Sequence, residues 1–204
     1  SNTVLIRPAL HMLESGSMPI PGRASHGRKR ASKLLDADSL FDFALKALGA
    51  RALSTGELRQ KLLKRAESPA SVDAVLTRLK EDGYLNDSRF AESYAASRRD
   101  NKGFGKMRVL RDLRQRRVAP PLAERAVSEA YENVDEKELI EQFLARKYRS
   151  VELGKYLHEP KNLASAFRRL RYAGFSGGAS ITVLKRYASR ADELDDLSEA
   201  EDEE

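Results

Sequence analysis

Residues 83–91 read Gly-Tyr-Leu-Asn-Asp-Ser-Arg-Phe-Ala, and they join two segments with helical periodicity. Gly83 can end the first helix, because glycine adopts the left-handed conformation found just after a helix C-terminus without strain. Asn86 or Asp87 can begin the second helix by accepting a backbone N–H group. A catalytic motif would gather histidines, cysteines or paired carboxylates, whereas this one specifies how two helices meet. It therefore favours a binding scaffold over an enzyme.

The composition of the 204-residue chain indicates a helical protein. Charged residues make up 33% of it, aromatic residues only 7%, and proline is scarce between residues 39 and 159. The chain has no cysteine, which excludes disulfides, thiolate nucleophiles and Cys-ligated zinc. No apolar run approaches the roughly 18 residues of a membrane span, and residues 1–20 lack a long apolar region. We therefore expect no membrane segment, no secretory signal and, by elimination, a cytoplasmic location.

The net charge of +6 conceals an uneven distribution of charge along the chain. Residues 39–191 carry 31 basic and 19 acidic side chains, a net charge of +12, whereas residues 192–204 carry nine acidic side chains and no basic one. A basic body favours a polyanionic partner, either nucleic acid or a protein assembly coated with it. The alternative is that arginine and lysine serve only as well-solvated helix formers.

A pattern of apolar residues repeats three times along residues 39–191. In the first predicted helix of each unit, the matching pairs are Phe41 and Leu45, Phe90 and Tyr94, and Leu139 and Phe143. In the second helix they are Leu58 and Leu62, Val109 and Leu113, and Ala166 and Leu170. In the third helix they are Val75, Leu76 and Leu79, then Ala126, Val127 and Ala130, then Val183, Leu184 and Tyr187. Three helices repeating in phase indicate tandem copies of one unit.

We therefore predict an all-α protein of three tandem three-helix units, each like a helix-turn-helix bundle, stacked into an elongated curved molecule. The predicted parts are a disordered or loosely docked basic arm at 1–38, repeats at 39–86, 87–134 and 135–191, and a disordered acidic tail at 192–204. The largest difference between the units is the connection 149–162 in the third.

A basic face is expected on the second helix of the second unit, after the turn Gly103-Phe104-Gly105. Val109 and Leu113 point to the core, so Arg108 and Arg111 lie on the opposite, exposed face. Such a face can meet phosphates or a carboxylate-rich surface, although a solvated amphipathic helix shows the same pattern. The candidate partner-binding residues are Lys64, Arg98, Arg99, Lys102, Lys106, Arg108, Arg111, Arg114, Arg168 and Arg171.

No candidate catalytic group or metal site emerges from the sequence. The run Gly103-Phe104-Gly105 lacks a preceding strand and the third glycine of a dinucleotide loop, so it is interpreted as a tight turn. His11, His26 and His158 are far apart and lack metal-ligand spacing. Arg89 is expected to form a structural ion pair with a carboxylate such as Asp87 or Glu92. The chain is therefore predicted to be neither an enzyme nor a protein with a cofactor or metal.

The run at 83–91 closely resembles the G-Y-L-D-D-x-R-F-A signature of the RecX family, regulators of the RecA recombinase. Three further segments agree with motifs of that family: Ser54-x-x-Glu57-Leu58-x-x-Lys61-Leu62, Gly103-Phe104-Gly105-Lys106-Met107-Arg108-Val109, and Lys147-Tyr148 with Arg171-Tyr172-Ala173-Gly174-Phe175. The match covers about residues 40–190. Its structural signature residues are Gly83, Tyr84, Leu85, Asp87, Arg89, Phe90, Gly103 and Gly105.

The sequence departs from the family pattern at three positions. Asn86 replaces an aspartate, which should preserve the helix cap, and Lys106 replaces a proline, which loosens a turn but adds charge. Arg117 stands where the family usually has a glycine, so the end of that helix is in question.

The resemblance implies three tandem three-helix units that bind the RecA–DNA filament, within or along its helical groove. It also implies inhibition of recombinase, ATPase and coprotease activity, and so a role in DNA recombination, DNA repair and the SOS response. Single- and double-stranded DNA would be weaker, electrostatic partners, and the chain is expected to be a monomer. The alternative interpretation is a tandem helix-turn-helix protein that acts directly on nucleic acid. Its exposed faces favour phosphate contact over base recognition.

Overall fold

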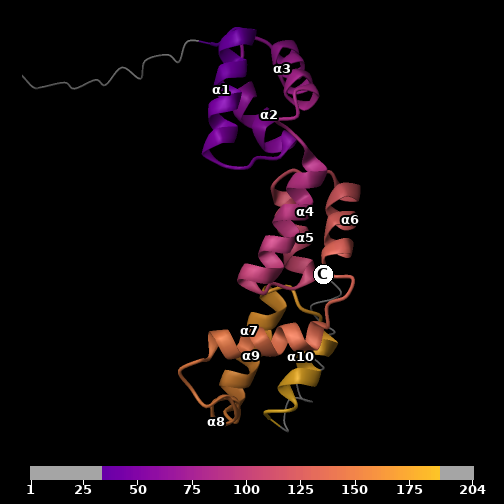
Figure 1. The fold of residues 1–204 in the computed structure, drawn as a ribbon. Coiled ribbons are helices and arrows are strands. Elements are labelled where there is room, and N and C mark those ends of the chain that lie inside the picture. The colour runs from indigo at the N-terminus through magenta and orange to yellow at the C-terminus, as the bar shows by residue number, and fades with distance from the viewer. Residues whose placement is uncertain (1–33, 189–204) are drawn as a thin grey trace, which may run out of the picture. The chain divides into compact units, whose positions relative to one another are not determined.

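The computed structural model describes residues 34–188, where helices are joined by short turns and loops (Figure 1). The helices are α1 (Ala37–Ala50), α2 (Thr55–Leu63), α3 (Pro69–Glu81), α4 (Asp87–Ser97), the π-helical turn η1 (Arg98–Lys102), α5 (Lys106–Gln115), α6 (Pro120–Ala130), α7 (Glu136–Lys147), α8 (Leu153–Leu157), α9 (Pro160–Tyr172) and α10 (Gly177–Leu184). Between residues 34 and 188 no strand forms beyond an isolated bridge of Leu35 with Ala66. The predicted all-α class is confirmed.

The two predicted tails lie mostly outside the described residues. Helix α1 begins at Ala37, where Asp36 caps it by accepting the Ser39 N–H group at 2.9 Å. The ordered fold therefore starts before residue 39, and it includes Leu35. The remainder of the arm and the whole acidic tail are not described.

The joint between α3 and α4 has the predicted geometry. Gly83 has a φ of 77°, in the left-handed region. Its N–H group donates to the Lys80 carbonyl at 3.1 Å, and the Tyr84 N–H group donates to the Leu79 carbonyl at 2.9 Å. These two bonds form a Schellman motif, which ends the helix. Asn86, rather than Asp87, caps α4 by accepting the Arg89 N–H group at 2.9 Å.

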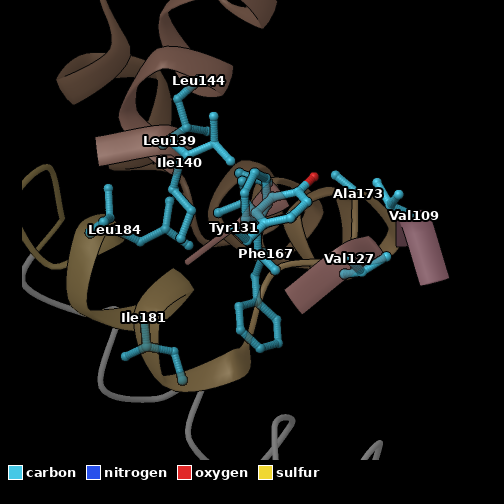
Figure 2. Close-up of a cluster of buried hydrophobic side chains, with 14 of the residues drawn as sticks. Val109, Val127, Tyr131, Leu139, Ile140, Leu144, Phe167, Ala173, Ile181 and Leu184 are labelled. Atoms are coloured by element: carbon cyan, nitrogen blue, oxygen red, sulfur yellow. The ribbon is translucent and has the colours of Figure 1, made fainter. Parts of the chain in front are cut away.

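Two hydrophobic cores form in the described part of the chain. One lies among α1, α2 and α3, and it is closed off by Leu85. The other runs without interruption from α4 to α10, and Figure 2 shows Ile140, Phe167 and Leu184 among its side chains. Helices of the second and third predicted repeats thus share one core. The repeat boundaries themselves stay a prediction.

In the first helices the most deeply buried positions lie one residue from the predicted pairs, although Leu139 is itself buried and the others pack against the cores. Leu40 and Ala44 are fully buried in α1, whereas Phe41 is only half-buried. In α4 the buried residues are Ala91 and Ala95, with Phe90 and Tyr94 beside them at half burial; in α7 Ile140 and Leu144 join the predicted Leu139. Alanine lets neighbouring helices approach closely, so the core-facing positions are not those of the largest apolar side chains.

The predicted pairs of the second helices are all buried. They are Leu58 and Leu62 in α2, Val109 and Leu113 in α5, and Ala166 and Leu170 in α9. The predicted long connection at 149–162 contains the short helix α8. Tyr187 lies beyond the end of α10 and is exposed, so its predicted core position is wrong.

Each second helix ends in a turn whose carbonyl group accepts a hydrogen bond from an earlier part of the chain. The three carbonyls belong to Arg65, Arg116 and Ala173, each three residues after the matching leucine of its helix. The Arg65 carbonyl accepts Leu35 N–H at 2.7 Å, and the Ala173 carbonyl accepts Gly105 N–H at 2.8 Å. The Arg116 carbonyl accepts the Ser54 hydroxyl. The start of α2 therefore contacts the end of α5, and the start of α5 contacts the end of α9.

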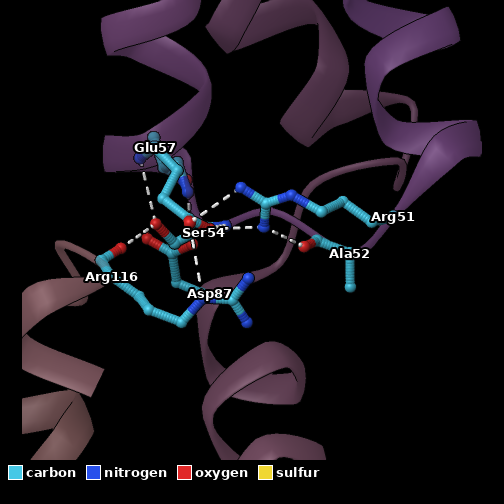
Figure 3. Close-up of polar contacts among 7 residues, drawn as sticks. Arg51, Ala52, Ser54, Glu57, Asp87 and Arg116 are labelled. Atoms are coloured by element: carbon cyan, nitrogen blue, oxygen red, sulfur yellow. Dashed lines mark hydrogen bonds and ion pairs between the residues drawn. The ribbon is translucent and has the colours of Figure 1, made fainter. Parts of the chain in front are cut away.

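The first junction, between the start of α2 and the end of α5, is built from side chains (Figure 3). Ser54 and Glu57 form a capping box at the start of α2. Glu57 also pairs with Arg116 at 3.3 Å, across the junction. The Thr55 N–H group donates to the Asp87 carboxylate at 2.7 Å. Asp87 thus links the start of α4 to the start of α2, instead of capping its own helix.

Two further residues shape the first junction. Arg51 pairs with Glu57 at 3.1 Å, from the opposite side to Arg116. Arg117 has a φ of 59°, the left-handed conformation that favours glycine. A Cβ atom on Gly56 would lie 2.5 Å from the Arg117 Cβ, so the two backbones approach each other closely. The helix end that the sequence left in question is therefore formed, but with a strained arginine.

The second junction, between the start of α5 and the end of α9, is built from backbone. The Gly105 and Met107 N–H groups donate to the Ala173 and Gly174 carbonyls at 2.8 and 3.2 Å. Gly174 has a φ of 91°. A Cβ atom there would lie 2.3 Å from the Arg108 nitrogen, and one on Gly105 would lie 2.3 Å from the Gly174 oxygen. Only glycine fits at either position.

Candidate functional site

The turn before α5 positions the predicted basic face. Gly103 takes the left-handed conformation, with a φ of 61°, directly after η1. The Tyr131 hydroxyl donates to the Phe104 carbonyl at 2.5 Å, which ties the turn to α6. Burial raises the pKa of Tyr131 far above its ordinary value, so the hydroxyl remains a hydrogen-bond donor even in alkaline solution. The predicted tight turn is thus fixed from the core side.

Arg108 is not the exposed residue that helical spacing predicted. Its side chain is only 22% exposed, and its guanidinium lies between the rings of Phe104, at 4.1 Å, and Tyr172, at 4.7 Å. It also pairs with Asp112 at 4.0 Å. Arg108 therefore belongs to the contact between α5 and α9. Packing of α9 covers the part of the predicted basic face on which Arg108 lies.

Arg111 lies at the exposed edge of the contact between α5 and α9. Its Nη2 atom and the Nη1 atom of Arg108 both donate to the Tyr172 carbonyl, each at 3.4 Å. The Tyr172 side chain is 66% exposed. Arg168 lies one helical turn before Tyr172 on α9, so it shares that face. The structure thus brings cations of the second and third predicted repeats together at the second junction.

The ten candidate partner-binding residues divide into two groups. Those with exposed side chains are Lys64, Lys102, Lys106, Arg111, Arg114 and Arg168. Those that are half-buried are Arg98, Arg99, Arg108 and Arg171. Arg98 lies over the Tyr94 ring at 4.7 Å, Arg99 bonds Asp100 and the Ala130 carbonyl, and Arg171 donates to the Phe175 carbonyl at 3.0 Å. In the exposed group, Arg111 also donates to the Tyr172 carbonyl and Arg114 pairs with Glu124 at 3.0 Å. The exposed group is the better candidate surface because its side chains remain accessible to solvent.

One cation near this surface was missed by the sequence interpretation. Arg146, near the end of α7, is exposed and lies over Gly103, where a Cβ atom would be 1.7 Å from its guanidinium. The only signal for it was its place in the basic last turn of that helix. Its position beside the turn depends on tertiary packing, which the spacing of residues does not reveal.

The expected ion pair of Arg89 is wrong. Asp87 accepts the Thr55 N–H group, and the Arg89 guanidinium forms no ion pair with any residue between 34 and 188. The Arg89 side chain is exposed.

Within residues 34–188, no group of three or more His, Asp or Glu side chains has the geometry of a metal site. Nor does that range contain a helix long and apolar enough to span a membrane. His158 lies just after α8, and the other two histidines are not described.

Comparisons with known proteins agree with this architecture. The family models described as the first and second three-helix domains of RecX match residues 41–79 and 86–127. A regulatory protein RecX from Deinococcus radiodurans is 33% identical over 153 residues, which cover 74% of this chain and 69% of that protein. The chain belongs to the RecX family. The match at 86 coincides with the N-cap of α4.

Further RecX proteins match over most of the chain. A regulatory protein RecX from Streptomyces coelicolor is 27% identical over 173 residues, which cover 85% of this chain and 88% of that protein. The crystal structure of RecX from Lactobacillus salivarius superposes with a TM-score of 0.57 at 18% identity, covering 74% of this chain and 96% of that one. At that identity the superposition supports the RecX fold alone.

Proposed function

We propose that this chain is a non-enzymatic regulatory protein that binds the RecA–DNA filament and inhibits RecA. The inhibited activities are strand exchange, ATP hydrolysis and coprotease activity. The family relationship supports a regulatory role, because the matching relatives are regulatory proteins by name. The basic body, with its net charge of +12 over residues 39–191, fits a partner that carries phosphates.

The observation that carries the proposal is the basic surface at the second junction. Lys106, Arg111 and Arg114 are exposed along α5, and Arg168 is exposed on the neighbouring helix α9. Backbone hydrogen bonds between Gly105 and Ala173 hold these two helices together. The helices that carry these cations are thus held at a fixed spacing, so no helix has to be ordered when the surface meets a rigid, repeating polyanion.

Inhibition follows from occupancy of the filament. Arginine and lysine side chains bind phosphates without reading base sequence, so the surface positions the protein along the DNA of any filament. A helical body held there blocks movements of the filament that recombination and ATP turnover need. We propose that the chain acts as a monomer in the cytoplasm, and that free single- and double-stranded DNA bind more weakly.

The test measures ATP hydrolysis by RecA on single-stranded DNA as the chain is added. The wild-type chain should lower the hydrolysis rate. For a variant with Lys106→Glu, Arg111→Glu and Arg114→Glu, the protein concentration that gives half-maximal inhibition should rise about tenfold or more, because three phosphate contacts become repulsive. Arg108 is left unchanged, since its removal would damage the junction between α5 and α9.

A charge-matched control carries Lys46→Glu, Lys61→Glu and Lys80→Glu, at exposed positions on α1, α2 and α3. It changes the net charge equally but should inhibit like the wild type. Equal loss in both variants would mean that only the overall charge matters. If the wild-type chain leaves the hydrolysis rate unchanged, the proposed function is wrong.

A second candidate function is direct regulation at DNA without RecA. It is favoured by the same exposed arginines, because the phosphates they fit are also present in bare DNA. Affinity for bare single-stranded DNA as high as that for the filament, at physiological salt, would support this alternative over the filament proposal.

A further inference from the structure

The side chains of Tyr84 and Arg89, in the run at 83–91, have no evident structural role within the described fold. Gly83 forms the helix end, Leu85 is buried, Asn86 is the cap, and Asp87 bonds Thr55. The Tyr84 side chain, in contrast, is 59% exposed. Arg89, one turn into α4, is also exposed, with no ion pair to any residue of the described range. Burial and capping therefore do not explain these two side chains.

Tyr84 and Arg89 line the same pocket, a depression of about 510 Å³ beside the first junction. Leu48 and Leu53 supply aliphatic lining, and Phe90 supplies an aromatic wall. The Arg116 guanidinium lies 5.1 Å from the centre of the Phe90 ring and braces it from the junction side. The volume falls within the range typical of ligand sites, about 300–1,000 Å³.

We infer that this pocket binds an acidic peptide segment of a protein partner, in which an apolar side chain stands next to a carboxylate. The apolar side chain would enter between the leucines and Phe90. The carboxylate would pair with Arg89, and Tyr84 would cover the segment from the rim. The inference rests on the proposed function, because it supplies the protein contact of a filament whose DNA is met by α5.

The charges of the pocket favour a peptide over nucleic acid. Arg116 is already paired with Glu57 at 3.3 Å, so Arg89 is the cation left for a ligand among the described lining residues. A single available cation in a described lining without acidic side chains suits one carboxylate, whereas the repeated phosphates of a DNA strand require several cations. The aliphatic lining of Leu48 and Leu53 likewise suits a leucine-like side chain.

The test uses the full chain with Tyr84→Ala, Arg89→Gln and both together. Binding is measured by fluorescence anisotropy to RecA filaments on single-stranded DNA, and to the same DNA without RecA. Each single change should weaken filament binding about tenfold, because hot-spot residues of an interface are commonly a tyrosine and an arginine. Affinity for bare DNA should stay within about twofold, since the α5 surface is intact. Thermal melting should show unchanged stability.

Two control variants carry the same kinds of change outside the pocket. Tyr187→Ala removes another exposed tyrosine, and Arg125→Gln removes an exposed arginine of α6. Both should bind filaments like the wild type. If the pocket variants also bind filaments like the wild type, the inference is wrong while the proposed function stands. If wild-type binding to filaments is absent, both are wrong.

Two other occupants would give different results. If the pocket variants lose affinity for bare DNA as much as for filaments, the pocket is a nucleic-acid site and the inference is overturned. The chain's own acidic segment contains Leu194 and Leu197 between carboxylates. If Leu194→Ser with Leu197→Ser tightens filament binding by the wild-type pocket, that segment is the occupant and the partner-peptide inference is overturned.

Discussion

At the first junction of the chain side chains make the linking hydrogen bonds, whereas at the second junction backbone hydrogen bonds join the two helices and Arg108 and Arg111 add side-chain contacts. At the start of α2, Ser54 reaches the Arg116 carbonyl through its hydroxyl group. At the equivalent start of α5, Gly105 reaches the Ala173 carbonyl through its own N–H group at 2.8 Å. The same docking geometry is thus achieved by a serine in one place and by a glycine in the other.

The surroundings of the two junctions differ accordingly. The second junction lies within the range of helices that share one continuous hydrophobic core, from α4 to α10. The first junction separates that core from the core of α1, α2 and α3, and an ion pair of Glu57 with Arg116 lies across it. Backbone bonds beside an apolar core resist salt and pH, whereas charged side chains respond to both. The first junction is therefore expected to respond more to salt and pH than the second.

The largest effect is expected from Gly174→Ala, which attacks the second junction. The new Cβ atom would lie 2.3 Å from the Arg108 nitrogen at a φ of 91°. Steric overlap and a disallowed backbone conformation together should cost about 3 kcal/mol or more of unfolding free energy. Chemical denaturation measures it. Gly178→Ala, at a position with open space, is the control and should not destabilise the chain.

A smaller loss is expected from Ser54→Ala at the first junction. The change removes the helix cap of α2 and leaves the Arg116 carbonyl without the Ser54 hydroxyl, at a site where Ser54 is fully buried. We expect a loss of about 2 kcal/mol in denaturation experiments. A loss larger than that of Gly174→Ala would reverse the ranking of the two junctions.

Acid should weaken the first junction through Glu57. Burial raises the pKa of this carboxyl, but hydrogen bonds from Arg51 and the Ser54 N–H group, with the charge of Arg116, lower it more, so the net pKa lies below its ordinary value of 4.5. A lowered folded pKa gives stability that is present above pH 4.5 and lost as the pH falls further.

The expected loss is about 1 kcal/mol, because the pairs of Glu57 are only partly buried. Melting temperatures recorded from pH 7 down to pH 3 for the wild type and for Glu57→Gln should converge at the acidic end. Curves that stay parallel would show that Glu57 does not contribute to the pH dependence.

The smallest effect is expected from Arg117→Gly, and it is a gain. Arg117 has a φ of 59°, at the position equivalent to Gly174 in the second junction. A left-handed arginine destabilises the folded state by about 1–2 kcal/mol. Glycine removes this strain, but its greater conformational entropy in the unfolded state offsets roughly half of the gain. The variant should therefore be about 0.5–1 kcal/mol more stable by chemical denaturation. Lower stability would mean that the arginine side chain makes contacts worth more than the strain.

The parts of the fold that follow from local rules were predictable from the sequence. Gly83 and Asn86 carry the chemistry of a helix end and a helix start, and both take those roles. The buried pairs of the second helices followed from spacing alone. The register of the first helices did not, because Ala91 and Ala95 carry little hydrophobic signal even though they face the core.

The candidate site was less predictable, because its exposure is decided by distant parts of the chain. The helical wheel of α5 places Arg108 on the outer face, but Tyr172, 64 residues later, covers it. Arg89 showed the opposite error, since its expected partner Asp87 is taken by Thr55 from another helix. Charge and periodicity identify which helices are basic, and tertiary contacts decide which cations are available.

Leu35 has a consequence for how molecules of this chain meet one another. Start-to-end docking is a heterologous contact, and such contacts continue from molecule to molecule into open fibres unless something stops them. At the end of α2, the first helix of this series, the Arg65 carbonyl accepts the Leu35 N–H group at 2.7 Å. The Glu67 N–H group donates to the Leu35 carbonyl at 3.2 Å. Leu35 thus satisfies the carbonyl at the first end of the series from within the same polypeptide, so a second copy is not needed to complete it.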